Sequence, residues 1–166
     1  MDILILMRHA KAAPEHDAPD DRSRALSPRG RIQAAEAAAA LIAQDLRPDQ
    51  ALVSAAARTR ETWALAGPGL GDPPATYREQ LYMADCETLW AEAVRAGAGR
   101  VLIVAHNPGL HALAAVLTEQ ACDKSRLGRS ILEGMAPAAW AAFEVHSDTL
   151  AASGAILRGG WSPQAT

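Results

Sequence analysis

Cysteine, clustered metal ligands and long hydrophobic runs are all scarce in this sequence, and each shortage excludes a class of protein. Cys86 and Cys122 are the only cysteines, and they do not stand in the Cys-x-x-Cys spacing of metal and redox sites. We expect both to be free thiols in a reducing cytoplasm. Histidine, cysteine and carboxylates also form no clustered pattern, so we expect neither a metal ion nor another cofactor.

No apolar segment near the N-terminus is long enough to target or anchor the chain. Residues 3–7 are apolar, but no basic region precedes them and Arg8-His9 ends the run. The net charge of -3 and the pI of about 5.9 create no general field that would attract nucleic acid or an anionic membrane. We therefore expect a cytoplasmic protein that binds neither, in which any anion-binding site is local.

Short apolar runs alternate with helical patterns along the chain. Four runs predict strands, the third of them weakly: residues 3–7, 51–53, 75–78 and 101–105. Apolar residues recur at helical spacing in four stretches: residues 28–46, 54–65, 87–96 and 110–117. Ser27-Pro28 is typical of a helix start, and we expect Ser54 to cap the second helix, which ends at Gly67-Pro68.

The remaining segments complete the expected fold. Residues 138–145 and 155–157, joined by a polar turn at 146–148, predict a hairpin at a sheet edge, and residues 12–24 predict a surface loop. With 166 residues, of which 49% are hydrophobic, the chain 1–166 is expected to form one domain. The order of elements predicts a three-layer α/β/α fold with a mainly parallel sheet and a C-terminal antiparallel edge hairpin.

Polar residues follow three of the predicted strands directly, which is where open α/β sheets bind ligands. They are Arg8-His9, residues 54–60 and His106-Asn107. Two histidines and two arginines at neighbouring strand ends favour a phosphoryl-transfer site, because that chemistry depends on positioning and on stabilising the charge of the phosphoryl oxygens. Arg8 and Arg58 would form a clamp, since a guanidinium donates two hydrogen bonds to phosphate and stays charged.

The two histidines are predicted to have different roles in this site. A neutral imidazole can attack phosphorus and split the reaction into phosphorylation of the enzyme and hydrolysis by water, and His9 is the predicted nucleophile. His106 would remain beside the phosphoryl oxygens as a hydrogen-bond donor, or as a positive charge if the bound anion raises its pKa. Arg24, in the long loop, is a further candidate for substrate binding at the rim of the pocket.

Several motifs, in order along almost the whole chain, resemble the histidine phosphatase, or phosphoglycerate-mutase-like, superfamily. The similarity is to its short branch, which includes bacterial phosphohistidine phosphatases of the SixA type. Besides the C-terminal hairpin, the matching segments are Leu6–Lys11, Arg24–Gly30, Ser54–Arg58 and Val104–Pro108. The resemblance implies the same α/β fold, a phosphatase activity and a phosphate pocket that consists of Arg8, His9, Arg58 and His106.

The sequence departs from the pattern of the superfamily at two points. Ala10 stands where the family usually has glycine, which would matter if this residue needed a positive φ. The general acid that larger relatives carry after the third strand has no clear counterpart. Glu79 is the best match, and Asp85 or Asp21 are alternatives.

Three functions remain open from the sequence. The lack of a clear general acid suits phosphohistidine as the substrate. Imidazole, with a pKa of about 6.5, leaves without being protonated first, whereas an alkoxide needs a proton. The leading hypothesis is therefore hydrolysis of phosphohistidine on a partner protein. The alternatives are a phosphatase for a small phosphoester, such as a sugar phosphate or nucleotide, and a non-catalytic module that binds phosphate. The sequence does not predict the oligomeric state.

Overall fold

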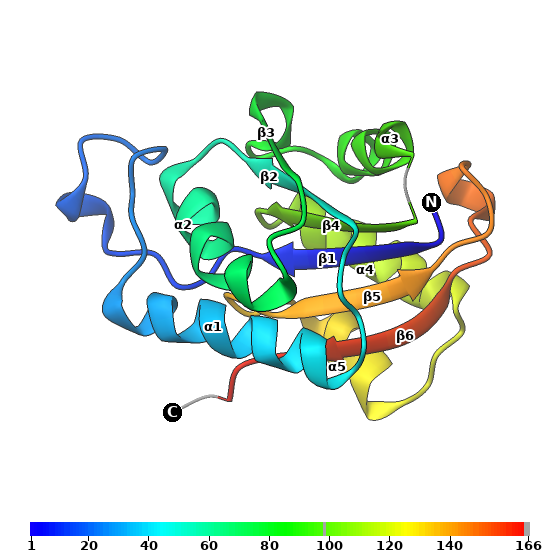
Figure 1. The fold of residues 1–166 in the computed structure, drawn as a ribbon. Coiled ribbons are helices and arrows are strands. Elements are labelled where there is room, and N and C mark those ends of the chain that lie inside the picture. Colours follow the sequence, from blue (N-terminus) through cyan, green and yellow to red (C-terminus); the bar gives the residue numbers. More distant parts are fainter. Residues whose placement is uncertain (98, 165–166) are drawn as a thin grey trace.

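A six-stranded mixed sheet runs through the middle of the molecule (Figure 1). The structure is a computed structural model that describes residues 1–97 and 99–164. The strands are β1 (Ile3–Arg8), β2 (Gln50–Ser54), β3 (Ala75–Arg78), β4 (Arg100–Ala105), β5 (Trp140–Glu144) and β6 (Ile156–Trp161). Their order in the sheet is β3-β2-β4-β1-β5-β6. The first four are mutually parallel, and β5 and β6 form an antiparallel pair at one edge.

Helices cover both faces of this sheet, as the sequence predicted. They are α1 (Pro28–Ala43), α2 (Ala57–Ala66), α3 (Cys86–Ala96), α4 (Gly109–Gln120) and α5 (Arg126–Glu133). The first two pack on one face and the other three on the opposite face. Among the described residues, no helix is both long and apolar enough to cross a membrane.

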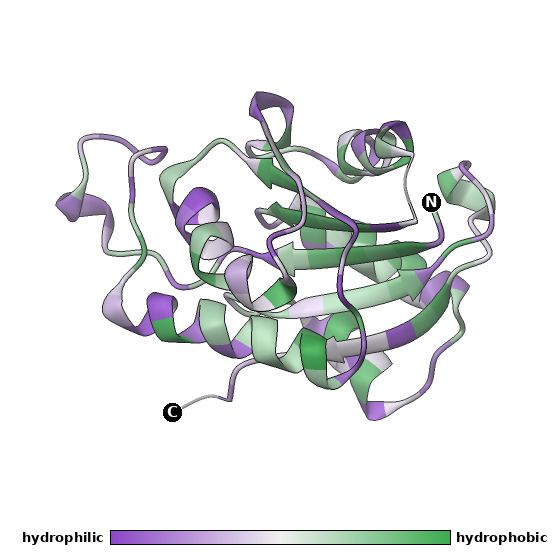
Figure 2. Cartoon of the chain, viewed as in Figure 1, coloured by the Kyte–Doolittle hydropathy of each residue, from purple (hydrophilic) through white to green (hydrophobic). Residues whose placement is uncertain are grey.

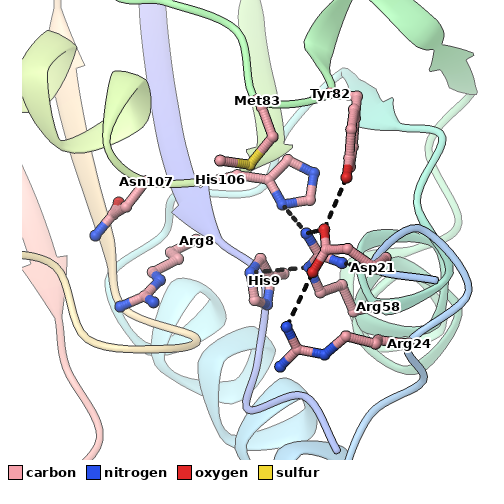
Figure 3. Close-up of a pocket in the computed structure, with 9 residues that line it drawn as sticks. All are labelled: Arg8, His9, Asp21, Arg24, Arg58, Tyr82, Met83, His106 and Asn107. Atoms are coloured by element: carbon pink, nitrogen blue, oxygen red, sulfur yellow. Dashed lines mark hydrogen bonds and ion pairs between the residues drawn. The ribbon is translucent and has the colours of Figure 1, made fainter. Parts of the chain in front are cut away.

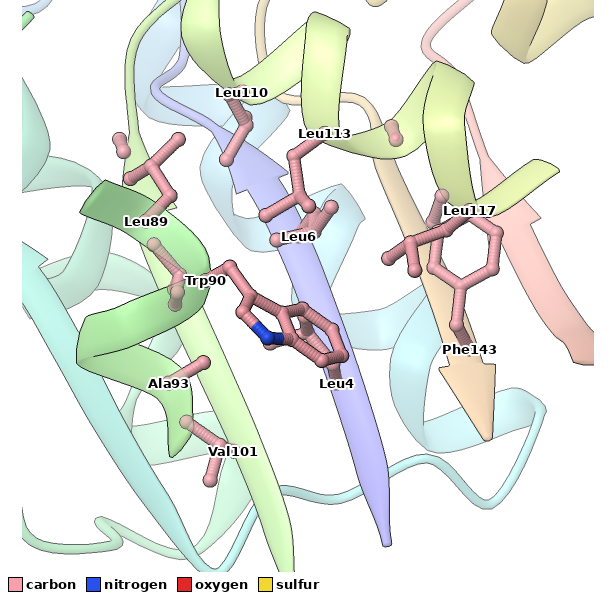
Figure 4. Packing of buried hydrophobic residues seen from close by; sticks show 14 of the residues in the cluster. Leu4, Leu6, Leu89, Trp90, Ala93, Val101, Leu110, Leu113, Leu117 and Phe143 are labelled. Atoms are coloured by element: carbon pink, nitrogen blue, oxygen red, sulfur yellow. The ribbon is translucent and has the colours of Figure 1, made fainter. Parts of the chain in front are cut away.

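The strand periodicity of two divides the hydrophobic core into two layers. Leu4 and Leu6 of β1 pack against α3 and α4 on one face (Figure 4), whereas Ile5 and Met7 face α1 and α2 on the other. All four side chains are fully buried. Figure 2 shows that the central strands are mostly hydrophobic, whereas many of the strongly hydrophilic residues lie in the surrounding loops and helices. Because both faces of the parallel strands are covered, their sequences are continuous apolar runs.

Most of the predicted elements are confirmed, and three local predictions are wrong. Ser27 caps α1 by accepting a hydrogen bond from the Gly30 amide, as expected. Ser54 does not cap α2, because two residues separate the end of β2 from the start of this helix. The N-cap position is occupied by Ala56. The predicted first helix ends at Ala43 rather than near residue 46. The connection between β5 and β6 is longer than the predicted turn and contains a short helix, Leu150–Ala152, and α5 was not predicted.

Candidate active site

The carboxyl ends of β1, β4 and β2 meet at one edge of the sheet, because these three strands are parallel neighbours. His9 and His106 directly follow β1 and β4, and the second residue of α2 is Arg58. A cavity of about 410 Å³ opens at this edge. Figure 3 shows its nine lining residues: Arg8, His9, Asp21, Arg24, Arg58, Tyr82, Met83, His106 and Asn107.

His9 presents an unprotonated nitrogen to the pocket. Its Nδ1 lies 2.8 Å from the carbonyl oxygen of Ala10, which can only accept, so Nδ1 carries the ring proton. The Nε2 atom accepts a hydrogen bond of 3.3 Å from Nε of Arg58. The pKa of His9 is lowered to about 4, first by burial and then by the nearby arginine charges, although the bond to Ala10 opposes this. The ring is therefore neutral at pH 7.

Arg58 connects the other groups of the pocket. Its side chain is almost completely buried, and it lies in the first turn of α2. Besides donating to His9, the guanidinium places Nη2 3.2 Å from Nδ1 of His106 and donates to the Asp21 carboxylate at 2.9 Å. Nη1 donates to the Asp21 backbone carbonyl. All three guanidinium nitrogens thus have partners that a phosphoryl group would have to share or replace.

His106 is held between Arg58 and a buried serine. Its Nε2 lies 2.8 Å from Oγ of Ser54, and its ring meets the Tyr82 ring edge-on with centroids 5.4 Å apart. The centroid of the His9 ring lies 5.1 Å away. The pKa of His106 is lowered to about 3, first by burial and then by the charges of His9 and Arg58. This ring is also neutral in the free protein.

Arg8 lies on the side of His9 opposite Arg58 (Figure 3). Its Nη1 donates a 2.8 Å hydrogen bond to the carbonyl oxygen of Met135, which also accepts from the Asn107 side chain at 3.1 Å. Burial lowers the pKa of Arg8, but an arginine remains charged at neutral pH. The two arginines therefore bring positive charge to His9 from opposite sides.

Asp21 is the acidic residue of the pocket, and the long loop after β1 brings it there. Its carboxylate accepts hydrogen bonds from the Tyr82 hydroxyl at 2.7 Å, from Arg58 at 2.9 Å and from Arg24 at 2.9 Å. These bonds, with that of Tyr82 the strongest, lower the pKa of Asp21 to about 2 although partial burial opposes them. The group is ionised at neutral pH, and it takes up donors that would suit a phosphoryl oxygen.

The structure brings five of the predicted site residues together and leaves the first candidate for the acid outside. Arg8, His9, Arg58, His106 and Arg24 all line the cavity. The Glu79 carboxylate instead pairs with Arg22 at 2.7 Å, and its side chain is 64% exposed. Asp85 accepts from the Thr88 amide at the start of α3. Of the three acidic candidates, the lining therefore includes only the second alternative, Asp21.

Ala10 does not need the conformational freedom of glycine. It is fully buried, its φ is not positive, and its amide donates to the Thr62 hydroxyl at 3.0 Å. Two further pocket residues, Tyr82 and Met83, were not predicted from the sequence. Both follow the short helix Glu79–Leu81, and nothing in their local pattern indicates that the tyrosine ring packs against His106.

The low pKa of His9 gives a direct prediction. A 15N or 13C NMR titration of the ring, assigned with a His9→Asn variant, should have its midpoint near pH 4 instead of the ordinary value of about 6.5. Because the folded protein disfavours the imidazolium, the nucleophilic nitrogen stays unprotonated throughout the neutral range. A midpoint close to 6.5 would mean that the ring is solvated and lacks the burial that this geometry requires.

Comparison with known proteins identifies relatives along the whole chain. A profile of the histidine phosphatase superfamily (branch 1) matches residues 4–85. An uncharacterized protein of Mycobacterium tuberculosis is 42% identical over 113 residues, which cover 67% of this chain and 69% of that protein. A Nakamurella multipartitia protein, named provisionally as the phosphohistidine phosphatase SixA, has a similar structure with a TM-score of 0.83 and 32% identity over 99% of this chain and 97% of its own. The structure of an Agrobacterium tumefaciens protein with the same provisional name has a TM-score of 0.80 and 25% sequence identity over 98% of both chains.

Proposed function

This chain belongs to the histidine phosphatase superfamily (branch 1), a family of phosphatases, and on that premise we propose that it hydrolyses phosphohistidine on a partner protein. One observation carries the proposal. A neutral histidine with an unprotonated Nε2 faces a pocket whose carboxylate, on Asp21, is held ionised. Such a pocket has a nucleophile and a positive clamp but no carboxylic acid that would protonate a leaving group.

The first step transfers the phosphoryl group to His9. Its Nε2 lone pair attacks phosphorus, a new N–P bond forms, and the N–P bond to the substrate imidazole breaks. The substrate imidazole leaves with the electron pair of that bond and takes a proton from water. Arg8 and Arg58 stabilise the charge on the phosphoryl oxygens during this exchange, and they act by position and charge alone.

The second step regenerates the enzyme. A water molecule attacks phosphorus, the bond to Nε2 of His9 breaks, and phosphate leaves with the oxygen of that water. The Nε2 lone pair is then restored, while Nδ1 keeps its proton because the Ala10 carbonyl holds it at 2.8 Å. That hydrogen bond keeps the attacking nitrogen the same in every cycle.

The acid–base properties of the pocket favour an imidazole over an alcohol as the leaving group. Imidazole leaves readily at neutral pH, whereas an alkoxide requires a general acid. Asp21 has a pKa of about 2 and His106 one of about 3, so neither carries a transferable proton in the free protein at pH 7. Glu79 pairs with Arg22 outside the lining residues. A small phosphoester would therefore be the slower substrate.

A substrate panel tests the proposal. The wild-type protein is incubated with a phosphohistidine-bearing protein, phosphoramidate, and a set of sugar phosphates and nucleotides, and released phosphate is measured. We expect kcat/KM to be highest for the phosphohistidine protein. A preference for a small ester would replace the proposal by the phosphoester alternative. Phosphate binding without turnover of any substrate would support a binding module.

A substitution of Asp21 should tighten phosphate binding. In the free protein this carboxylate accepts hydrogen bonds from Arg58 and Arg24. An incoming phosphate must therefore compete with the Asp21 carboxylate for these donors. Asp21→Asn removes the charge and weakens that competitor. We expect the inhibition constant of inorganic phosphate to fall about tenfold, which corresponds to about 1.4 kcal/mol. The measurement is product inhibition by phosphate at pH 7.

The neighbouring carboxylate provides the control for this test. Asp20 accepts hydrogen bonds from Ser23 on the same loop and does not line the pocket, so Asp20→Asn should leave phosphate inhibition unchanged. Weaker phosphate binding in Asp21→Asn would indicate that Asp21 holds Arg58 in place instead of competing with the ligand. A selective loss of activity on alkyl phosphates would identify Asp21 as a general acid.

A further inference from the structure

Ser54 is a fully buried serine whose hydroxyl lies against His106. Its Oγ is 2.8 Å from Nε2 of the histidine ring. Ser54 is the last residue of β2, His106 follows the last residue of β4, and these strands are paired up to Val53 and Val104. The sheet therefore fixes the distance between the two side chains, although they are far apart in the sequence.

The hydroxyl of Ser54 has no other assigned role in the local fold. The turn between β2 and α2 is held by Thr59, whose Oγ1 donates to the backbone carbonyls of Ser54 and Ala56 at 2.7 Å. The α2 N-terminus receives no side-chain cap from Ser54. Removal of the Ser54 hydroxyl would thus leave these contacts in place and would affect His106 alone.

The hydrogen bonds of the free protein fix the position of the proton on His106. A guanidinium can only donate, so Nδ1, which lies 3.2 Å from Nη2 of Arg58, is the acceptor and has no proton. The ring is neutral because its pKa is about 3, and the single proton must then be on Nε2. In this state Nε2 donates to Ser54, whose oxygen accepts.

A bound phosphoryl group reverses what Nδ1 must do. The oxygens of a phosphoryl group that lies against Arg58 accept hydrogen bonds, and an unprotonated nitrogen facing them would be repelled. To contribute binding energy, Nδ1 must gain a proton, either from water or from the monoprotonated anion. Because Nε2 keeps its own proton, the ring is then a cation with both nitrogens protonated.

We propose that Ser54 is a positioning residue that keeps Nε2 of His106 paired in each of these states, and so allows Nδ1 to change from acceptor to donor when a phosphoryl group binds. The hydroxyl oxygen accepts a hydrogen bond from the protonated Nε2 both in the neutral ring of the free protein and in the cation of the complex. The proton of Ser54 itself stays on Ser54 throughout. This inference rests on the proposed phosphatase function and assigns a role at the same site.

Imidazole NMR of the wild-type protein tests the proton switch without any turnover. With 15N-labelled histidine, the free protein at pH 7 should show His106 protonated on Nε2 and unprotonated on Nδ1. Saturation with inorganic tungstate, an anion similar to phosphate, should add a proton to Nδ1. If Nδ1 remains unprotonated in the tungstate complex, the proposal is overturned, whether or not the protein hydrolyses phosphohistidine.

The role of Ser54 itself is tested by substitution. We expect Ser54→Ala to weaken tungstate binding about tenfold, to lower kcat about tenfold on the best substrate of the panel, and to reduce the Nδ1 protonation of His106 in the complex. Ser54→Thr retains a hydroxyl and suits a strand end. This variant should have wild-type tungstate binding, kcat and Nδ1 protonation of His106. Unchanged binding and an unchanged His106 spectrum in Ser54→Ala would contradict the assignment.

Ser153 provides a matched control for the loss of a buried hydroxyl. It is also fully buried, and its Oγ donates to the side chain of Gln120 away from the pocket. Ser153→Ala should change thermal stability about as much as Ser54→Ala but leave tungstate binding and the His106 spectrum unchanged. If wild type hydrolyses no phosphohistidine, the proposed function fails, while the tungstate spectra still decide the role of Ser54.

Discussion

His9→Ala should abolish hydrolysis, with kcat reduced on the order of 10⁴-fold or more, because it removes the proposed nucleophile that forms the covalent intermediate. His106 is the other histidine of the lining, but its Nε2 is paired with the buried Ser54, and its Nδ1 is expected to bind the phosphoryl oxygens rather than to attack phosphorus. The variant should still bind phosphate, since both arginines remain. Steady-state kinetics on the best substrate of the panel measures the loss.

Trapping of the intermediate separates this result from simple misfolding. Wild type quenched at alkaline pH during turnover should gain the mass of one phosphoryl group, and His9→Ala should gain none. His111 supplies the control, because it is also half-buried and its Nε2 lies 3.0 Å from the Ile131 carbonyl, away from the pocket. His111→Ala should retain activity. If His9→Ala kept more than a tenth of the wild-type rate, the nucleophile would have to be another group.

The positions of the main site residues could be predicted from the sequence because strand endings are strongly marked. The apolar runs at 3–7 and 101–105 stop abruptly at Arg8-His9 and His106, and parallel strands bring such endings to one edge. In the structure these residues and Arg58 line one pocket. Their catalytic roles remain predictions.

Contacts between distant segments explain what the sequence did not reveal. Ser54 has the residue type and position of a helix cap, but its hydroxyl instead forms a hydrogen bond with His106, 52 residues further along. Asp21 lies in a loop without periodicity, and its place in the pocket depends on Tyr82 and Arg58. A local pattern carries no information on either contact, because neither results from a helical or strand repeat.

The acid candidates illustrate the same difference between local and distant signals. Glu79 matches the family by its place after the third strand, yet the neighbouring charge of Arg22 holds its carboxylate outside the lining of the pocket. Asp21 lies in the loop between β1 and α1, far from Glu79 in the sequence. It reaches the pocket because Arg58 and Arg24 attract it. Electrostatic contacts within the folded chain, rather than sequence spacing, determine which carboxylate lines the pocket.

Arg58→Lys should lower kcat/KM by about 10² to 10³-fold although it conserves the charge, because a lysine cannot reproduce the planar fork. The guanidinium contacts His9 through Nε and His106 and Asp21 through Nη2, at distances between 2.9 and 3.3 Å. A single ammonium group cannot hold both histidines and a phosphoryl oxygen in these positions. Kinetics with the phosphohistidine protein and tungstate binding would both report the loss.

Arg60 is the matched control for this substitution, because it lies two residues further along the same helix and its guanidinium stacks over Tyr77, outside the pocket. Arg60→Lys should therefore alter kcat/KM less than about threefold, within the range expected for an exposed side chain. A small effect of Arg58→Lys as well would mean that positive charge alone is sufficient at this position. A large effect only at Arg58, with tungstate binding weakened in parallel, would support the fork as the element that orients the phosphoryl group toward Nε2 of His9.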